Sequence, residues 1–178
     1  MGRMVALLRA VNVGGRKLPM AELRVLCGEL GWTDVATYIQ SGNVVFTAPG
    51  KPEAIEVALE AALAKQYGMD VPVIVRSKAE WAKYQAENPF PQEAKDEPAR
   101  LMLVVTKRPP AAGAAEAIEA RATEGERVRR AGDVLWFHFP NGAGASKLTP
   151  SLVDRAIGSP GTARNYNTVM KLKEMLAA

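Results

Sequence analysis

The sequence predicts an α/β protein in which a ferredoxin-like half is followed by a second, similar α/β half. Three observations support this fold class. The 178 residues are 48% hydrophobic and 24% charged, which is typical of a globular protein. Residues 3–75 show strand and helix patterns in the order β-α-β-β-α-β, the split βαβ unit of ferredoxin-like domains. After a proline-rich stretch, a similar order begins again near residue 101.

The first half begins with a strand and an amphipathic helix. Residues 3–12 form a nearly continuous apolar run, which is typical of a central strand covered on both faces. Pro19 suits the first position of a helix, and Gly31 suits its left-handed end. Apolar residues between them recur at helical spacing. Cys27 lies on this apolar face, so we expect a buried core thiol.

A hairpin, a second helix and another strand complete the first half. The β-rich segments 34–39 and 43–47 flank a turn in which Gly42 supplies the positive φ. A helix is expected over residues 52–68. Residues 71–75 predict a strand, and its proline is typical of a sheet edge or a strand start.

A change of composition separates the two halves. Ser77 and Glu80 predict a capping box at the start of a third helix. Residues 88–98 hold three prolines without periodicity, which indicates a connection. We expect a ferredoxin-like domain with its connecting helix over residues 1–87 and a proline-rich connection over residues 88–99. A second half with a C-terminal helix follows over residues 100–178.

The second half repeats the order of elements without repeating the residues. Its terminal helix is expected to replace the final strand of the first half, which gives β-α-β-β-α and then this helix. A strand is expected at residues 101–105 and a helix at 111–122. The hairpin strands are expected at 127–130 and 134–139. The second helix is expected at 149–158 and the terminal helix at 164–176.

The composition excludes several classes of site. Cys27 and His138 are the only residues of their types, so an internal disulfide and a zinc site of Cys and His ligands are impossible. His138 alternates with Trp136 on one strand face and is more simply a packed residue. No acidic cluster has metal-ligand spacing, and no carboxylate pair indicates acid–base catalysis. We therefore expect neither a metal nor a cofactor, and whether the protein is an enzyme stays open.

Charge and hydropathy limit the partners. The net charge of +4 permits nucleic-acid or phosphate partners without requiring them. No apolar stretch approaches the roughly 20 residues of a membrane helix, and Arg9 interrupts the apolar run near the N-terminus. The single thiol and the lack of a targeting signal predict a cytoplasmic location. No membrane partner is expected, and the sequence leaves the oligomeric state open.

The first candidate site is the glycine-rich loop after the first strand. Its glycines can turn N–H groups toward an anion, and a helix start follows. A guanidinium on an apolar strand face, as predicted for Arg9, needs an anionic partner or carbonyls. The alternative is a tight turn with solvated cations and an internal carboxylate beside Arg9. The candidate ligand-binding residues of this loop are Arg9, Asn12, Gly14, Gly15 and Lys17.

Two further segments carry candidate ligand-binding residues. Gln40, Ser41 and Asn43 offer directed donors and acceptors at the hairpin tip, although Ser and Asn are also ordinary turn residues. In the tail, cations lie near helix starts, which suits phosphate or carboxylate. The alternative there is a capping segment that ties the last helix to the core. The tail candidates are Lys147, Arg164, Asn165 and Asn167.

Several of these segments resemble a known family. Residues 6–15, 19–23 and 38–46, together with 146–148 and 162–169, are similar to the bacterial domain-of-unknown-function family 1697. Tyr166 is a mild departure, because the family often has Trp there. The resemblance covers nearly the whole chain. It implies a ferredoxin-like α/β architecture and supplies no activity.

Three classes of function are compatible with these residues. We favour a binding module for a phosphate-bearing ligand, either a nucleotide or a nucleic acid, because cations and N–H groups recur without a nucleophile or metal set. One alternative is an enzyme acting on a phosphorylated or carboxylated small molecule, with Ser41 or Tyr38 as a hydroxyl participant. The other is a protein-interaction module that uses the strand at 71–75 or the tail helix.

Overall fold

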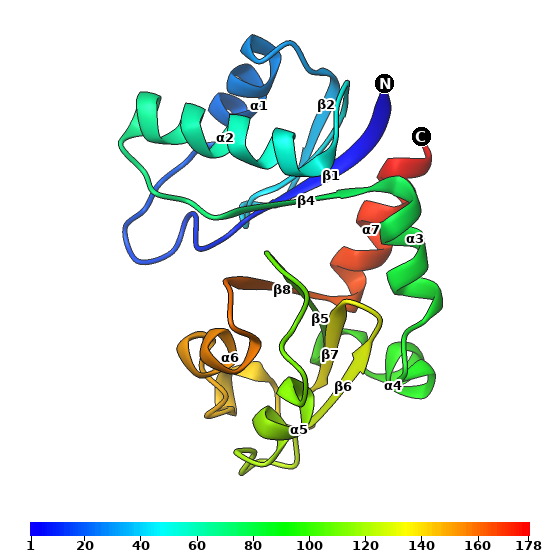
Figure 1. Ribbon diagram of the computed structural model, residues 1–178. Helices are drawn as coiled ribbons and strands as arrows, with labels where there is room; N and C mark the ends of the chain where they lie inside the picture. Colours follow the sequence, from blue (N-terminus) through cyan, green and yellow to red (C-terminus); the bar gives the residue numbers. More distant parts are fainter. The chain divides into compact units, whose positions relative to one another are not determined.

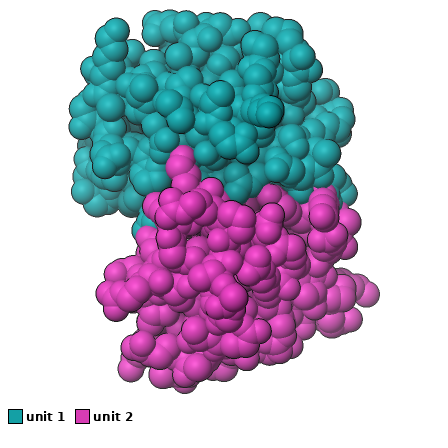
Figure 2. Space-filling view, viewed as in Figure 1, with its two compact units in different colours: residues 1–82, 172–178 teal, residues 83–171 magenta.

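The computed structural model describes residues 1–178 and contains two four-stranded antiparallel sheets with helices (Figure 1). The chain forms two compact units (Figure 2). Unit 1 comprises residues 1–82 and 172–178, and unit 2 comprises residues 83–171. The predicted mixed α/β class is therefore confirmed.

Unit 1 has the predicted order β-α-β-β-α-β. Its sheet runs β2-β3-β1-β4, and each neighbouring pair is antiparallel. Both helices cover the same face of this sheet (Figure 1). The central strand is buried from Met4 to Leu8, as the continuous apolar run predicts. The elements are β1 (Gly2–Leu8), α1 (Met20–Glu29), β2 (Thr33–Tyr38), β3 (Asn43–Ala48), α2 (Pro52–Tyr67) and β4 (Val73–Ser77).

The first strand is shorter than the apolar run that predicts it. β1 ends at Leu8, because Ala10 and Asn12 adopt positive φ angles of 55° and 58° that an extended strand does not allow. Arg9 therefore lies in a loop, and the prediction of a guanidinium on the face of a central strand is wrong. Gly42, with φ 86°, turns the hairpin as predicted.

Cys27 lies in the core of unit 1, as predicted. Its side chain is fully buried among the apolar residues of α1 and the sheet. Burial raises the pKa of this thiol to about 12, because the thiolate would lose its hydration. The thiol is therefore protonated at neutral pH and contributes as a small apolar group.

The free edge of β4 is occupied by carboxylates from α2. Glu56 Oε2 accepts a hydrogen bond from Val75 N at 2.8 Å, and Glu60 Oε2 accepts one from Val73 N at 3.1 Å. An exposed edge strand would otherwise present these N–H groups to another chain. A partner strand at this edge would have to displace both carboxylates.

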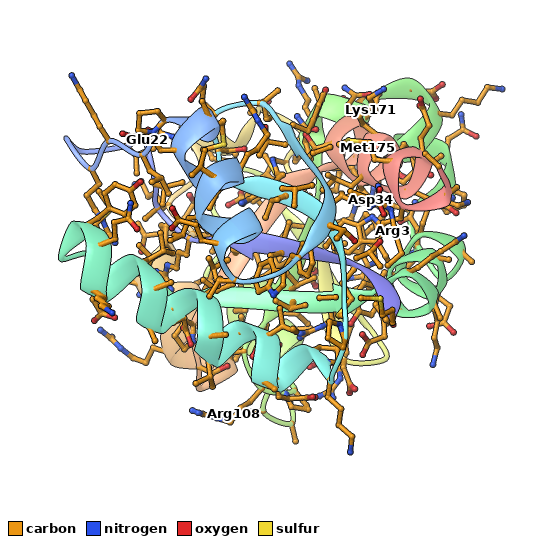
Figure 3. All side chains as sticks on the ribbon, turned by 90° about the horizontal axis from the view of Figure 1, so that it is seen from above. Arg3, Glu22, Asp34, Arg108, Lys171 and Met175 are labelled. Carbon is orange, nitrogen blue, oxygen red and sulfur yellow. The ribbon has the colours of Figure 1, made fainter.

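A capping box and the side chain of Arg3 stabilise the ends of unit 1. Ser77 N donates to Glu80 Oε2 at 2.7 Å and Glu80 N donates to Ser77 Oγ at 3.2 Å, which confirms the capping box of α3 (Lys78–Ala86). Arg3 donates to the carbonyls of Asp34 at 2.8 Å and Met175 at 3.3 Å (Figure 3). Arg3 thereby ties the end of α7 (Tyr166–Ala177) to the sheet of unit 1.

Unit 2 repeats the complete order of unit 1. Its sheet runs β6-β7-β5-β8 and is antiparallel throughout, so the strand arrangement is the same as in unit 1. The expectation that the terminal helix replaces the last strand is wrong, because β8 precedes this helix. The elements are β5 (Leu101–Thr106), α5 (Ala114–Glu119), β6 (Arg127–Ala131), β7 (Val134–His138), α6 (Pro150–Ile157) and β8 (Gly161–Asn165).

β8 is difficult to predict from the sequence, because polar residues occupy its buried positions. Its two buried positions are Thr162 and Arg164, and the exposed position between them is Ala163. The alternation of apolar and polar residues that identifies a half-buried strand is therefore inverted. α5 is also shorter than expected, because Gly113 adopts a left-handed φ of 76° immediately before it.

The proline-rich stretch contains short helices instead of irregular chain. Pro91 opens α4 (Pro91–Asp96), and a 3₁₀ turn, η1, follows over Pro98–Arg100. Side chains attach this segment to the sheet of unit 2. Arg127 pairs with Glu93 at 3.0 Å, and His138 Nε2 lies 3.2 Å from Glu97 Oε2. His138 is 5% exposed, in agreement with the prediction of a packed residue.

Candidate anion-binding site

The loop between β1 and α1 is folded by its own backbone. Asn12 N donates to Arg16 O at 2.5 Å, and Arg16 N donates to Val13 O at 3.1 Å. Gly14 and Gly15 lie between them with φ angles of 58° and 85°, which glycine adopts at little cost. The loop therefore turns back on itself before α1 begins.

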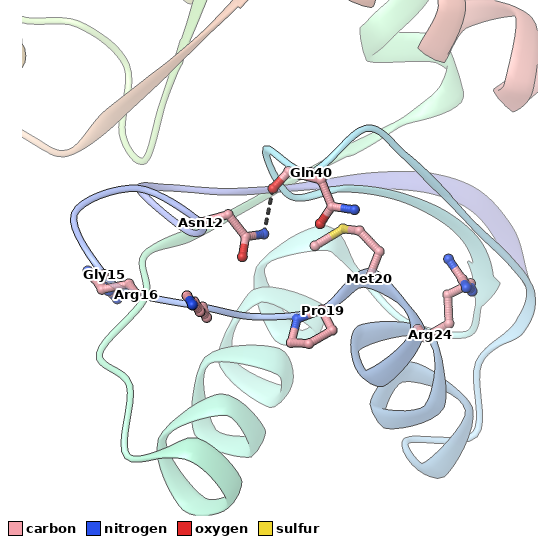
Figure 4. A pocket seen from close by; sticks show the side chains of 9 residues that line it. Asn12, Gly15, Arg16, Pro19, Met20, Arg24 and Gln40 are labelled. Atoms are coloured by element: carbon pink, nitrogen blue, oxygen red, sulfur yellow. Dashed lines mark hydrogen bonds between the residues drawn. The ribbon is translucent and has the colours of Figure 1, made fainter.

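The carboxamide of Asn12 joins this loop to the hairpin tip. Its Oδ1 accepts from Leu18 N at 2.8 Å, while its Nδ2 donates to Leu18 O at 2.9 Å and to Gln40 O at 2.6 Å (Figure 4). Both hydrogens of the amide are thereby used within the protein. Asn12 is thus placed to position the loop, and its amide has no donor left for a ligand.

A groove of about 760 Å³ lies where the loop, the start of α1 and the hairpin tip meet (Figure 4). Four of the predicted site residues line it, namely Asn12, Gly15, Lys17 and Gln40. Three of the lining side chains are cationic, and none is a carboxylate. The complete lining is Asn12, Gly15, Arg16, Lys17, Pro19, Met20, Ala21, Arg24 and Gln40.

None of the three cations of the groove has a carboxylate partner. Arg16 donates to the carbonyl of Asp70 at 2.8 Å, and Arg24 donates to Thr37 Oγ1 at 2.5 Å. Both acceptors are neutral. The Lys17 side chain is exposed. Because none of the three is neutralised, the groove is a region of positive potential.

The start of α1 adds N–H groups to the same groove. Pro19 occupies the N-cap position and offers no side-chain acceptor to the first turn. The N–H groups of Met20 and Ala21 therefore have no partner inside the helix, and both residues line the groove. The positive end of the helix dipole supports the side-chain charges.

The other unit 1 candidates lie outside the lining of the groove. Arg9 is half-buried, and its backbone N–H donates to Pro72 O at 3.1 Å. Asn43 is fully buried, and its Nδ2 donates to Tyr38 O and to Ser41 Oγ, each at 3.0 Å. Asn43 and Ser41 thus brace the turn of the hairpin. Gly14 is exposed in the loop.

The tail candidates belong to unit 2. Asn165 Oδ1 accepts from Thr168 N at 3.0 Å and so caps α7, the alternative role considered from the sequence. Arg164 is 8% exposed and donates to Thr162 Oγ1 at 2.8 Å. Burial lowers the pKa of its guanidinium to about 10. Lys147 and Asn167 are exposed.

Sequence reasoning missed Arg24 as a residue of the groove. Arg24 follows Met20 by four positions on α1, so the two side chains lie on the same side of the helix. A charged residue on an amphipathic helix usually faces solvent, and the sequence gives no sign that the hairpin reaches it. The signal that could have identified Arg24 is its position four residues after Met20, because this spacing places it on the same side of the helix as the start of α1.

Two other kinds of functional feature are absent from the structure. No group of three or more His, Cys, Asp or Glu side chains lies close enough together to hold a metal ion. None of the helices combines the length and the apolar character needed to cross a membrane.

Comparison with known proteins gives a family and a fold. The model of a family described as protein of unknown function (DUF1697) matches residues 1–136. The structure is similar to that of a conserved bacterial protein from Streptococcus pneumoniae, with a TM-score of 0.76 and 24% sequence identity over 98% of each chain. At this identity the likeness establishes the fold alone. No curated protein matches the sequence.

Proposed function

We propose that unit 1 binds a phosphate-bearing ligand, a nucleotide or a nucleic acid, in the groove at the start of α1. The chain belongs to the DUF1697 family of proteins of unknown function. The observation that carries this proposal is a groove lined by three cations and no carboxylate. Several arginines elsewhere are paired with carboxylates, as where Arg76 pairs with Glu56 at 3.6 Å and Arg129 with Glu119 at 2.6 Å. Unpaired cations gathered around one concavity favour an anionic occupant.

Phosphate suits this groove because it accepts several hydrogen bonds at once. Arg16 and Lys17 supply charged donors, and the first turn of α1 supplies backbone N–H groups. A hydrogen bond to a charged group contributes about 1.5–3 kcal/mol. Since the groove is open to solvent, salt is expected to screen the attraction.

The duplicated fold provides an internal comparison. The loop between β1 and α1 spans residues 9–19, whereas the corresponding loop of unit 2 spans residues 107–113. In the shorter loop, Arg108 donates to the carbonyl of Gly158 at 2.9 Å. The following helix, α5, has only six residues. The longer loop and the ten-residue helix that follows it are thus features of unit 1, which supports placing the function there.

The lining favours binding over catalysis. It contains no hydroxyl, imidazole, thiol or carboxylate that could serve as nucleophile or general base. Ser41 and Tyr38, the two hydroxyls considered from the sequence, lie outside this lining, and Ser41 accepts a hydrogen bond from Asn43. A protein partner at the edge of β4 is disfavoured, because Glu56 and Glu60 occupy that edge.

Replacing both loop cations tests this proposal. Adenosine 5′-monophosphate is titrated by calorimetry into the protein and into the Arg16→Ala/Lys17→Ala double variant at about 20 mM salt, where screening is weak. We expect the double variant to bind at least about tenfold more weakly, because two charged hydrogen bonds are lost. Salt at about 200 mM is expected to weaken binding to the unaltered protein.

The matched control is Lys51→Ala, which removes an exposed cation of unit 1 that lies outside the groove. Its affinity is expected to stay within about twofold, since surface charges away from a site contribute little. Equal affinities of the double variant and this control would contradict the proposal.

A further inference from the structure

The cations of the groove are held at two separate places. Arg16 is held by the carbonyl of Asp70, and Arg24 is held by the hydroxyl of Thr37 on β2. Figure 4 shows Arg16 and Arg24 at opposite ends of the lining. The chain from Lys17 to Arg24, an extended segment followed by one helical turn, allows their Cα atoms to lie at most about 15 Å apart. A single phosphate would have to draw both guanidiniums away from these acceptors, whereas two phosphates could each meet one end.

The middle of the groove is neutral. Pro19 is exposed and provides the apolar surface there, Met20 lines the groove while being largely buried, and the Gln40 side chain lies over Met20 (Figure 4). Gln40 is exposed, and the hydrogen bond from Asn12 uses only its backbone carbonyl. Its carboxamide therefore keeps two donors and an acceptor for a ligand, the set that pairs with the edge of a base.

We infer that the ligand carries two phosphate groups joined by a neutral unit that also bears a hydrogen-bonding group, as in a nucleoside 3′,5′-bisphosphate, where the ribose joins the phosphates and the base lies beside them. One phosphate lies at Arg16 and Lys17, the other lies at Arg24, and the nucleoside lies along Pro19, Met20 and Gln40. This inference rests on the proposed function and adds the ligand class. A single nucleotide is favoured over a nucleic acid, because the net charge of +4 is small and the lining has no aromatic ring on which successive bases could stack.

The test compares adenosine 3′,5′-bisphosphate with adenosine 5′-monophosphate by calorimetry. The unaltered protein is expected to bind the bisphosphate at least about tenfold more tightly, because one more charged contact forms. In Arg24→Ala the ratio of the two affinities is expected to fall to near one. In Lys51→Ala the ratio is expected to stay as in the unaltered protein. Unchanged thermal unfolding shows that each variant is folded.

The possible results distinguish a failure of this inference from a failure of the proposed function. Equal affinities for the two ligands would overturn the inference while leaving the phosphate site intact. A bisphosphate advantage that survives in Arg24→Ala would overturn it as well. A ten-nucleotide oligodeoxyadenylate that binds more than tenfold more tightly than the bisphosphate would overturn it in favour of a nucleic acid. Failure of both nucleotides to bind would contradict the proposed function itself.

Discussion

Gly42→Ala is expected to destabilise the protein by about 3 kcal/mol, since strain and a clash act together. Gly42 has a φ of 86°, in the left-handed region that side chains disfavour. A Cβ at this position would lie 2.7 Å from Val11 Cγ2 and 2.8 Å from Leu8 Cβ. Both neighbours belong to the end of β1 and its loop, so the hairpin tip and the cationic loop would be pushed apart. Chemical denaturation measures the free energy of unfolding.

Gly50→Ala separates the two causes. Gly50 also has a positive φ, of 102°, but a Cβ there meets nothing within 4 Å. Only the conformational strain of about 1–2 kcal/mol is expected. Equal losses in Gly42→Ala and Gly50→Ala would show that the close approach at the hairpin tip does not matter.

Glu126→Gln is expected to destabilise unit 2 by about 2–4 kcal/mol. The Glu126 side chain is 3% exposed, and its carboxylate accepts from Glu124 N at 2.5 Å and from Ser146 Oγ at 2.8 Å. The amide of glutamine turns one of these acceptors into a donor that faces another donor. Leaving buried polar groups unpaired costs about 1–3 kcal/mol each, and more beside a charge. Glu116→Gln, on the exposed side of α5, is the matched control.

The pH dependence of unit 2 follows from its carboxylates. Burial alone would raise the pKa of Glu126, but the hydrogen bonds from Ser146 and backbone N–H groups outweigh it and lower this pKa. The backbone N–H of Val128 and then the side chain of Arg129 lower the pKa of Glu119. A carboxyl with a lowered folded-state pKa stabilises the fold above its ordinary pKa, and this contribution is lost as the pH falls through the folded value.

Unit 2 is therefore expected to lose stability as the pH drops below about 4.5, the ordinary glutamate pKa. Glu126→Gln is expected to flatten this dependence, whereas Glu116→Gln is expected to retain it. Amide hydrogen exchange, followed separately for the two sheets, measures the effect. The same pH slope in Glu126→Gln and in the unaltered protein would contradict the assignment.

The sequence predicts those parts of the fold whose pattern is local. The apolar run of β1, the helical spacing of the two helices and the glycine of the first hairpin together predict the ferredoxin-like order of unit 1. β8 escaped prediction because the buried face of this strand consists of Thr162 and Arg164, which read as polar surface. Their burial depends on the neighbouring strands, which the local pattern does not reveal.

In the candidate site, too, the sequence predicts some residues directly and gives no local signal for others. The charge of Lys17 and the flexibility of Gly15 can be read directly, and both residues line the groove. The role of Asn12 cannot be read, because its partners Leu18 and Gln40 come within reach only after the loop has folded. Arg24 joins the groove through the packing of α1 against β2, a contact between segments that no local pattern connects.

The most direct test of a phosphate site in unit 1 is a titration followed by amide chemical shifts. Adenosine 5′-monophosphate is added to ¹⁵N-labelled protein, and the shift of each backbone N–H is recorded. We expect the largest changes at Gly15, Arg16, Lys17, Met20 and Ala21, which line the groove. Changes confined to unit 2, or an even spread of small changes over exposed lysines and arginines, would contradict the site.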